Sequence, residues 1–274
     1  MTAGLVNSAG TSTNAGTING GANITGGELD TNKSTSIISG GITNSATVKA
    51  AGQVFGAVVN AGTFTVTGAT VGDGSSVTNT GVLTVNGGAS FTQTGTTANS
   101  GSVTINAGGT YGGGNYNQTA GSTSIGGSGG ALTASGSMTV SGGSVLNNGT
   151  VNAGAGGVTV SGASTAFDNF GTVSAGAGAA AGALTNRATF TNESGATVTA
   201  PVINTGTIAA KGGTFDGAIQ NNSGGMFTVM GNVTGANVFT NAAGGTLTVS
   251  SGGLTLETAV WFWREGENRA FSRA

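Results

Sequence analysis

Short runs in which apolar and polar residues alternate strictly recur along the chain. In residues 63–67 every second side chain is apolar, and the same alternation appears in 102–105, 137–140 and 246–249. This period predicts half-buried β-strands, because side chains on a strand point alternately to its two faces. β-Branched residues dominate, and helix signals are almost absent before residue 257, so we predict an all-β fold.

A longer repeat carries these strands. One phrase, an asparagine, a small residue and a glycine followed by alternating apolar positions, recurs throughout. Clear copies begin at Asn60, Asn79 and Asn99, and looser copies begin at Asn148, Asn169, Asn204, Asn222 and Asn241. Many units also hold a Gly-Gly pair, a small residue and one apolar residue, as at 87–91 and 108–111. The period is close to 20 residues, with irregular spacing between 121 and 200.

A unit of this length holds two or three strands of three to five residues, which is too little to bury an apolar face alone. Stacked units can bury one if each strand pairs in parallel with its neighbour in the next unit. We therefore predict a rod-like parallel β-solenoid (β-helix) of about twelve coils with a thin apolar core. Glycine and asparagine would sit at the corners because both tolerate positive φ. Asparagines at matching corners would hydrogen-bond along the stack.

Two other β architectures fit parts of the pattern. Antiparallel hairpins at spacings of about 8–12 residues would make a sandwich or a barrel. A silk-like or amyloid-like disordered repeat would tolerate the irregular spacing in the middle of the chain. The regular unit with matching corners favours the solenoid.

Composition excludes several kinds of chemistry. The 274 residues include 56 glycines, 16 charged residues, one proline, and neither cysteine nor histidine. Disulfides, Cys/His metal sites, cysteine proteases and histidine general bases are therefore impossible. A formal net charge of −2 provides no basic surface for nucleic acid. We find no signal peptide and no membrane-spanning segment, and we expect no cofactor, no metal site and no catalytic residue.

The asparagine phrase followed by a Gly-Gly corner resembles the passenger region of bacterial type V secreted proteins, over roughly residues 7 to 256. These are autotransporter adhesins and filamentous-haemagglutinin-like proteins with autotransporter-associated β-strand repeats. The resemblance implies a right-handed solenoid, a cell-surface or extracellular location, and host-surface or glycan ligands. Members of the family also carry a signal peptide and a translocator β-barrel. The chain shows neither, so we expect a fragment, a truncated product or a passenger-only segment.

The last residues differ from the rest. We assign 1–256 to the solenoid and 257–274 to an atypical tail, which holds six of the sixteen charges and both tryptophans. The tail would act as a cap that closes the end of the stack, or it is a non-native extension.

Threonine often occupies the outward position between two apolar residues. Stacked, these residues would form one flat ladder, consisting of Thr65, Thr84, Thr104, Thr139, Thr159, Thr228 and Thr248. A second outward file holds Thr63, Ser102, Ser137 and Thr246, and is interrupted by Val82, Gly157 and Met226. An ice-binding solenoid would need two unbroken threonine files, whereas β-propensity on a solvated face explains the same residues.

The carboxylates suggest an alternative function. Some β-helices are carbohydrate-active enzymes with acidic residues grouped on one face. Here Glu28 and Asp30 would share one face of a strand if a strand forms there, and Asp168 and Asp216 could approach within two or three coils. Scattered corner residues explain them more simply. We predict a non-enzymatic structural and adhesive rod segment of a secreted bacterial cell-surface protein, with an ice- or surface-binding solenoid and a carbohydrate-active enzyme as alternatives.

Overall fold

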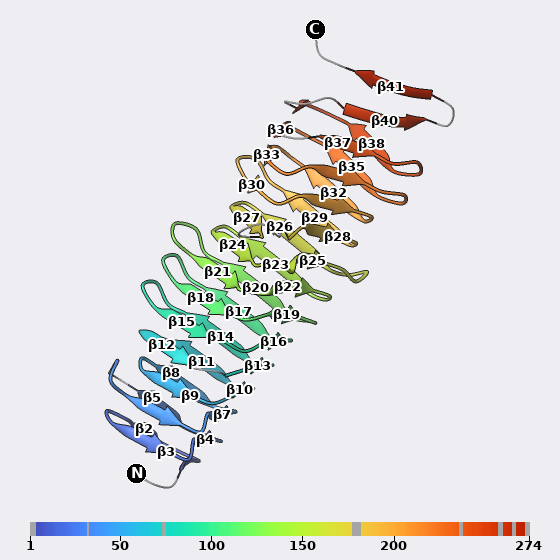
Figure 1. The fold of residues 1–274 in the computed structure, drawn as a ribbon. Helices are drawn as coiled ribbons and strands as arrows, with labels where there is room; N and C mark the ends of the chain where they lie inside the picture. Colours follow the sequence, from blue (N-terminus) through green and yellow to red (C-terminus); the bar gives the residue numbers. More distant parts are fainter. Residues whose placement is uncertain are drawn as a thin grey trace. The chain divides into compact units, whose positions relative to one another are not determined.

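The computed structural model describes residues 4–31, 33–72, 75–176, 182–235, 238–256, 260–264 and 267–271. Within these residues every helix or strand is a β-strand (Figure 1). The chain divides into two compact units, 1–135 and 136–274.

Unit 1 is a stack of coils with up to three short strands each. The first strands are β1 (Leu5–Asn7), β4 (Ala22–Ile24), β7 (Ile42–Asn44), β10 (Val58–Asn60), β13 (Val77–Asn79), β16 (Thr97–Asn99) and β19 (Tyr116–Gln118). The second strands are β2 (Thr11–Thr13), β5 (Glu28–Thr31), β8 (Thr47–Ala50), β11 (Thr63–Val66), β14 (Val82–Val85), β17 (Ser102–Ile105) and β20 (Ser122–Ile125). The third strands form two sheets, β3 (Thr17–Asn19), β6 (Ile37–Ser39) and β9 (Gln53–Phe55), then β12 (Ala69–Gly72), β15 (Ser90–Gln93), β18 (Thr110–Gly113) and β21 (Ala131–Ala134).

Unit 2 repeats this plan. Its first strands are β22 (Ser137–Val140), β25 (Gly157–Val160), β28 (Leu184–Asn186), β31 (Val202–Asn204), β34 (Ile219–Asn221), β37 (Phe239–Asn241) and β40 (Val260–Arg264). Its second strands are β23 (Ser144–Asn147), β26 (Ala166–Asn169), β29 (Thr189–Asn192), β32 (Thr207–Ala210), β35 (Met226–Val229) and β38 (Thr246–Val249). Its third strands are β24 (Thr150–Ala153), β27 (Thr172–Ala175), β30 (Thr197–Val198), β33 (Gly213–Phe215), β36 (Asn232–Gly235) and β39 (Gly253–Leu256).

Corresponding strands of successive coils pair in parallel. In unit 1, β10 pairs with β13 so that Val58 lies beside Val77 and Asn60 lies beside Asn79. Like residues therefore stack on like residues from coil to coil. This pairing confirms the parallel β-solenoid with coils of about 20 residues, and it excludes the antiparallel sandwich and the disordered repeat.

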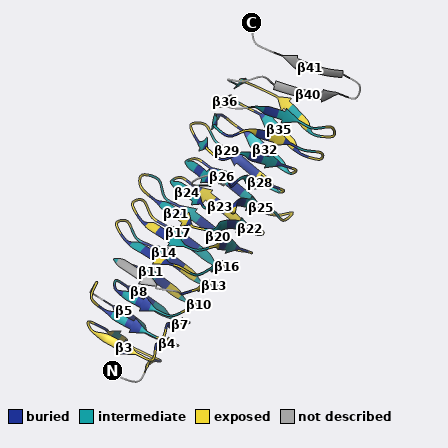
Figure 2. Ribbon diagram, in the orientation of Figure 1, coloured by how far each residue is buried: buried dark blue, intermediate teal, exposed yellow. Residues whose placement is uncertain are grey.

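The core consists of one inward side chain at every second strand position, and Figure 2 shows the resulting alternation of buried and exposed residues along the strands. Aromatic rings stack inside each unit. In unit 1 the ring of Phe91 lies 5.3 Å from that of Tyr111, and in unit 2 the ring of Phe227 lies 5.6 Å from that of Phe215 and 5.2 Å from that of Phe239. Each inward ring therefore packs on rings of neighbouring coils, which adds to the burial of apolar area.

Two buried tyrosines bring polar groups into the core of unit 1. The Tyr111 hydroxyl lies 2.6 Å from Thr97 Oγ1, and the Tyr116 hydroxyl lies 2.5 Å from Thr123 Oγ1. Both rings are almost fully buried. Burial raises the pKa of both phenols well above the usual range, although their hydrogen bonds act in the opposite direction. The two hydroxyls are therefore neutral in the folded protein near neutral pH.

A ladder of buried amides joins five consecutive coils of unit 1. Its members, Asn44, Asn60, Asn79, Asn99 and Gln118, each end a first strand. Asn60 Nδ2 donates to Asn79 Oδ1 at 2.7 Å, and Asn79 Nδ2 donates to Asn99 Oδ1 at 2.9 Å. Each of the four asparagines donates to the amide of the following coil, so the ladder has a direction. The predicted hydrogen bonding of corner asparagines along the stack is confirmed.

Unit 2 holds two such ladders at different corners. One ends the second strands and consists of Asn147, Asn169 and Asn192. The other ends the first strands and consists of Asn186, Asn204, Asn221 and Asn241. The Asn-x-Gly phrase therefore serves two different corners of the coil. This change of corner contributes to the irregular sequence spacing between 121 and 200.

Glycines at the corners have two separate roles. At Gly81, which follows a ladder asparagine, an added Cβ would lie 2.2 Å from the carbonyl oxygen of Gly62 in the previous coil. At Gly88, in a Gly-Gly corner, the backbone has φ of 76° and open space around it. The prediction that asparagines also adopt positive φ is wrong, since every described residue with positive φ is a glycine. Corner asparagines serve as hydrogen-bonding groups instead.

The predicted tail lies partly outside the described residues, which exclude 257–259, 265–266 and 272–274. Strand β40 pairs in parallel with β37, and β41 (Glu267–Phe271) pairs with β40 in antiparallel fashion. The domain boundary at residue 256 and the cap or extension hypotheses stay predictions.

Candidate functional site

The seven predicted surface threonines form three short files rather than one ladder. Thr65, Thr84 and Thr104 stack on the second strands of unit 1. Thr139 stacks with Thr159 on the first strands of unit 2, and Thr228 stacks with Thr248 on its second strands. All seven are half-buried or exposed. The split arises because similar phrases occupy different strands of the coil, and the role of these residues in surface contact stays a prediction.

The second outward file is interrupted as expected. Thr63 lies beside Val82, which is 42% exposed, and Val82 lies beside Ser102. In unit 2, Met226 lies beside Thr246. The second strands of the described chain therefore do not carry the two unbroken threonine files that an ice-binding face would need.

A longer threonine file, which the sequence analysis missed, follows the third strands of unit 2. We name it the six-threonine file, and it consists of Thr150, Thr172, Thr197, Thr214, Thr234 and Thr255. Each member is directly beside the next, and all six are half-buried or exposed. The hydroxyls of Thr214 and Thr234 lie 3.2 Å apart. With parallel strands about 4.8 Å apart, the file extends over about 24 Å.

The spacing of these threonines explains why they were missed. Successive members are 22, 25, 17, 20 and 21 residues apart in the sequence, because the corners between their strands differ in length. A search at a fixed period of 20 does not align them. The recognisable signal is a threonine placed immediately before an inward apolar residue, as in Thr172-Val173 and Thr214-Phe215.

A ridge of large side chains runs beside this file, at the corner between the second and third strands. We name it the corner ridge, and it consists of Phe170, Glu193, Lys211 and Met230. Backbone hydrogen bonds from these residues to the preceding coils, such as Glu193 N to Asn169 O at 2.8 Å, hold them in one stack. Phe170 is 49% exposed and Met230 is 46% exposed. Glu193 and Lys211 form an ion pair at 2.8 Å.

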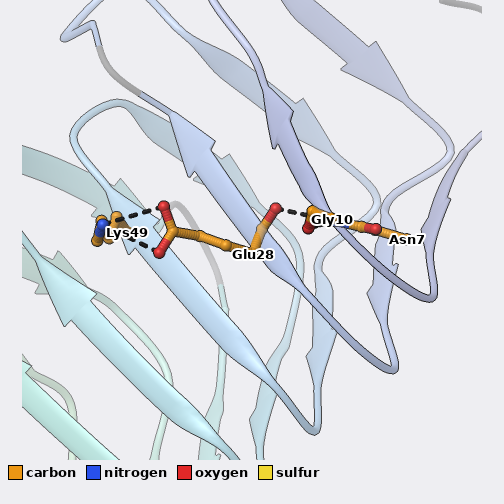
Figure 3. Close-up of polar contacts among 4 residues, drawn as sticks. All are labelled: Asn7, Gly10, Glu28 and Lys49. Atoms are coloured by element: carbon orange, nitrogen blue, oxygen red, sulfur yellow. Dashed lines mark hydrogen bonds and ion pairs between the residues drawn. The ribbon is translucent and has the colours of Figure 1, made fainter.

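The predicted acidic residues fall into separate surroundings. Glu28 and Asp30 share the outward face of β5, and Figure 3 shows Glu28 paired with Lys49 of the next coil at 2.9 Å. The hydrogen bond to Glu28 raises the pKa of Lys49. Asp168 lies on a second strand, whereas Asp216 directly follows a third strand, so the structure does not stack these two residues. No group of three or more potential metal-ligating side chains occurs in the described part of the chain.

Concave regions occur among the described residues of unit 1. One, of about 400 Å³, lies along the glycine corners Gly20–Gly21 and Gly40–Gly41. Another, of about 310 Å³, is lined by Leu5, Ile18 and Leu29 of the first coils. Neither is lined by a charged side chain.

Comparisons with known proteins add little to this description. No protein-family model matches the chain, and no curated protein matches it significantly. The chain is similar to the crystal structure of the TibC-catalyzed hyper-glycosylated TibA55-350 fragment, with 22% identity over 92% of this chain and 93% of that chain, at a TM-score of 0.33. A likeness of this size supports no further conclusion. The described residues contain no helix that could span a bilayer.

Proposed function

We propose that the chain is a structural and adhesive segment of a secreted bacterial surface protein, of the kind found in autotransporter passengers. The observation that carries this proposal is the outer surface of the coils. Along unit 2, successive third strands present the six-threonine file in unbroken register. A fold that repeats one outward residue type over many coils presents an extended surface for binding. It brings few different side chains together at one point, as a catalytic site would need.

Such a surface suits adhesion through many weak contacts. Each threonine hydroxyl can donate one hydrogen bond and accept others. A single exposed hydrogen bond contributes little net free energy to binding. Repeated along a stack, the contacts act on the same extended ligand, and their combined affinity rises through effective concentration. The absence of cysteine from the sequence suits a protein that is exported before it folds.

The alternative of a carbohydrate-active enzyme has less support. Glycoside hydrolysis uses two carboxyl groups on either side of the scissile bond. Glu28 and Asp30 lie on one strand of an open sheet face, and Lys49 already pairs with Glu28. Neither residue lines the concave regions of unit 1.

Retention of protein-coated beads on surfaces tests the proposed function. Beads that carry the full 274-residue chain are washed over epithelial cell layers under flow, with albumin-coated beads as the control. We expect several-fold greater retention of the chain-coated beads. Equal retention of the two kinds of bead would contradict the adhesive role.

A further inference from the structure

The six-threonine file and the corner ridge are adjacent on every coil that carries both. Phe170 precedes Thr172 by two residues, and Lys211 precedes Thr214 by three. One glycine separates Phe170 from the start of β27 and Lys211 from the start of β33, so ridge and file run side by side along unit 2. We propose that this combined surface binds a neutral glycan chain that lies along the stack. The inference rests on the proposed adhesive function and specifies its ligand.

The ridge supplies exposed apolar groups beside the threonine file. Phe170 and Met230 are among the few large apolar side chains that are about half exposed in unit 2. They lie at either end of the ion pair between Glu193 and Lys211. Sugar rings combine an apolar C–H face with a rim of hydroxyls. An exposed ring and a thioether can therefore cover the apolar faces of two sugars along the chain.

The file supplies the matching polar groups. A threonine hydroxyl donates one hydrogen bond and accepts others, as a sugar hydroxyl does, so either partner can adopt either role. The side chain is β-branched and restricted at χ1, which fixes the hydroxyl with little loss of entropy on binding. Next to the file, Asn152 lies beside Ser174 in register, which widens the polar strip.

Charge on this unit favours a neutral ligand over an anionic one. Between residues 136 and 256 the charged side chains are Asp168, Arg187, Glu193, Lys211 and Asp216. Lys211 is engaged by Glu193, and Asp168 also lies close enough to raise its pKa. Outside this ion pair, two carboxylates (Asp168 and Asp216) and one cation (Arg187) remain, so this surface offers sulfated or phosphorylated polymers no cluster of positive charge.

The length of the file indicates a polymer as the ligand. Six threonines extend over about 24 Å. A single sugar contacts only one or two of them, and such contacts are weak in water. A chain of several sugars contacts the whole file at once, so its affinity depends on the number of hydroxyls that remain.

Substitution of threonine by valine tests the inference, because valine keeps the β-branched shape and removes the hydroxyl. The test variant is the triple substitution Thr172→Val, Thr197→Val and Thr214→Val in the full chain. The matched control is Thr65→Val, Thr84→Val and Thr104→Val on unit 1. Binding is measured by interferometry on immobilised mannan and dextran as neutral polymers, and on heparin as an anionic polymer. Circular dichroism verifies that both variants keep the β fold.

We expect the unaltered chain to bind at least one neutral polymer more tightly than heparin. The test triple should weaken this binding about tenfold or more, and the control triple should change it less than about twofold. Phe170→Ala should weaken it by several-fold. Failure to bind either neutral polymer, preference for heparin, or equal effects of the two triples would overturn the inference.

The bead assay separates this inference from the proposed function. If beads coated with the unaltered chain adhere to cells and the test triple adheres equally well, adhesion stands and the threonine surface is not its site. If the unaltered chain does not adhere to cells, the adhesive function itself fails, whatever polymer the purified chain binds.

Discussion

Replacing Asn79 by alanine measures how much the amide ladder contributes to stability. Asn79 is fully buried and lies in the middle of the ladder of unit 1. It accepts from Asn60 Nδ2 at 2.7 Å and donates to Asn99 Oδ1 at 2.9 Å and to the carbonyl oxygen of Ser102 at 3.0 Å. Alanine removes these contacts together with a further donation to the carbonyl oxygen of Gly81 at 3.2 Å, and leaves the neighbouring amides in place.

The magnitude follows from the groups left without a partner. Asn99 loses the Asn79 donor to its Oδ1, and a buried acceptor without a partner costs about 1–3 kcal/mol. Asn60 loses Asn79 as an acceptor but still donates to the carbonyl oxygen of Val82 at 2.9 Å, so the free-energy cost at Asn60 lies at the lower end of the same range. We therefore expect Asn79→Ala to lower the free energy of unfolding by about 2–4 kcal/mol, a large share of the stability of a typical domain.

Guanidinium unfolding followed by far-UV circular dichroism measures this change. The matched control is Asn106→Ala, since Asn106 is exposed and only a 3.5 Å hydrogen bond joins it to Asn86. The control should change the free energy of unfolding by less than about 0.5 kcal/mol. Asn79→Asp keeps the shape but loses both amide donors, so it should destabilise more at pH 7 than near about pH 4, where the carboxyl gains a proton. Equal stability of Asn79→Ala and the Asn106 control would refute the reasoning.

Other substitutions and conditions test the corners and the core. Gly81→Ala should destabilise unit 1 by more than about 3 kcal/mol, because the added Cβ would collide with the backbone of the previous coil. Gly88→Ala should cost only about 1–2 kcal/mol, because alanine is strained at the positive φ of this residue. Thermal unfolding of the two variants measures the difference. Phe227→Ala should cost about 3–5 kcal/mol in denaturant unfolding, and a loss below about 1 kcal/mol would contradict its place in the ring stack. Tyr111 and Tyr116, the two tyrosines of the chain, should stay protonated in the folded state beyond pH 10 while the unfolded state ionises. The contribution of the two tyrosines to the free energy of unfolding should therefore be constant below about pH 10 and then fall by about 1.4 kcal/mol per pH unit for each tyrosine. The rise in absorbance at 295 nm, which reports tyrosine ionisation, should coincide with unfolding. A rise that precedes unfolding would contradict their burial.

The sequence predicts the fold class well because the relevant pattern is local. Alternating apolar residues define strands, and a glycine two residues after an asparagine marks a corner in several coils, as at Asn60, Asn79 and Asn99. In-register stacking then repeats each choice, so the buried ladder through Asn60 and Asn79 follows from spacing alone. The prediction of hydrogen-bonded corner amides succeeded for this reason.

The candidate surface could not be predicted in the same way, because it depends on which strand each phrase occupies. The phrase at Asn169 ends a second strand, whereas the phrase at Asn204 ends a first strand. Both look alike in sequence. Threonines at equal spacing therefore separate onto different faces, and the six unevenly spaced threonines meet on one face. The corner ridge has no repeating residue type, so no period in the sequence reveals it.

The overlap of the two ladders in unit 2 limits how such a protein can change length during evolution. Residues 184–201 carry both Asn186 and Asn192, and so join coils whose amides lie at different corners. Duplication of residues 202–218 would add one rung to a continuous ladder. A coil copied from 137–156 into the same place would instead set the buried amide of Asn147 against an alanine or a valine, and remove the amide acceptor that Asn147 has in its own ladder. Genetic exchange between coils is therefore tolerated within a ladder, and the coil at 184–201 marks the boundary that such exchange cannot cross without a loss of stability.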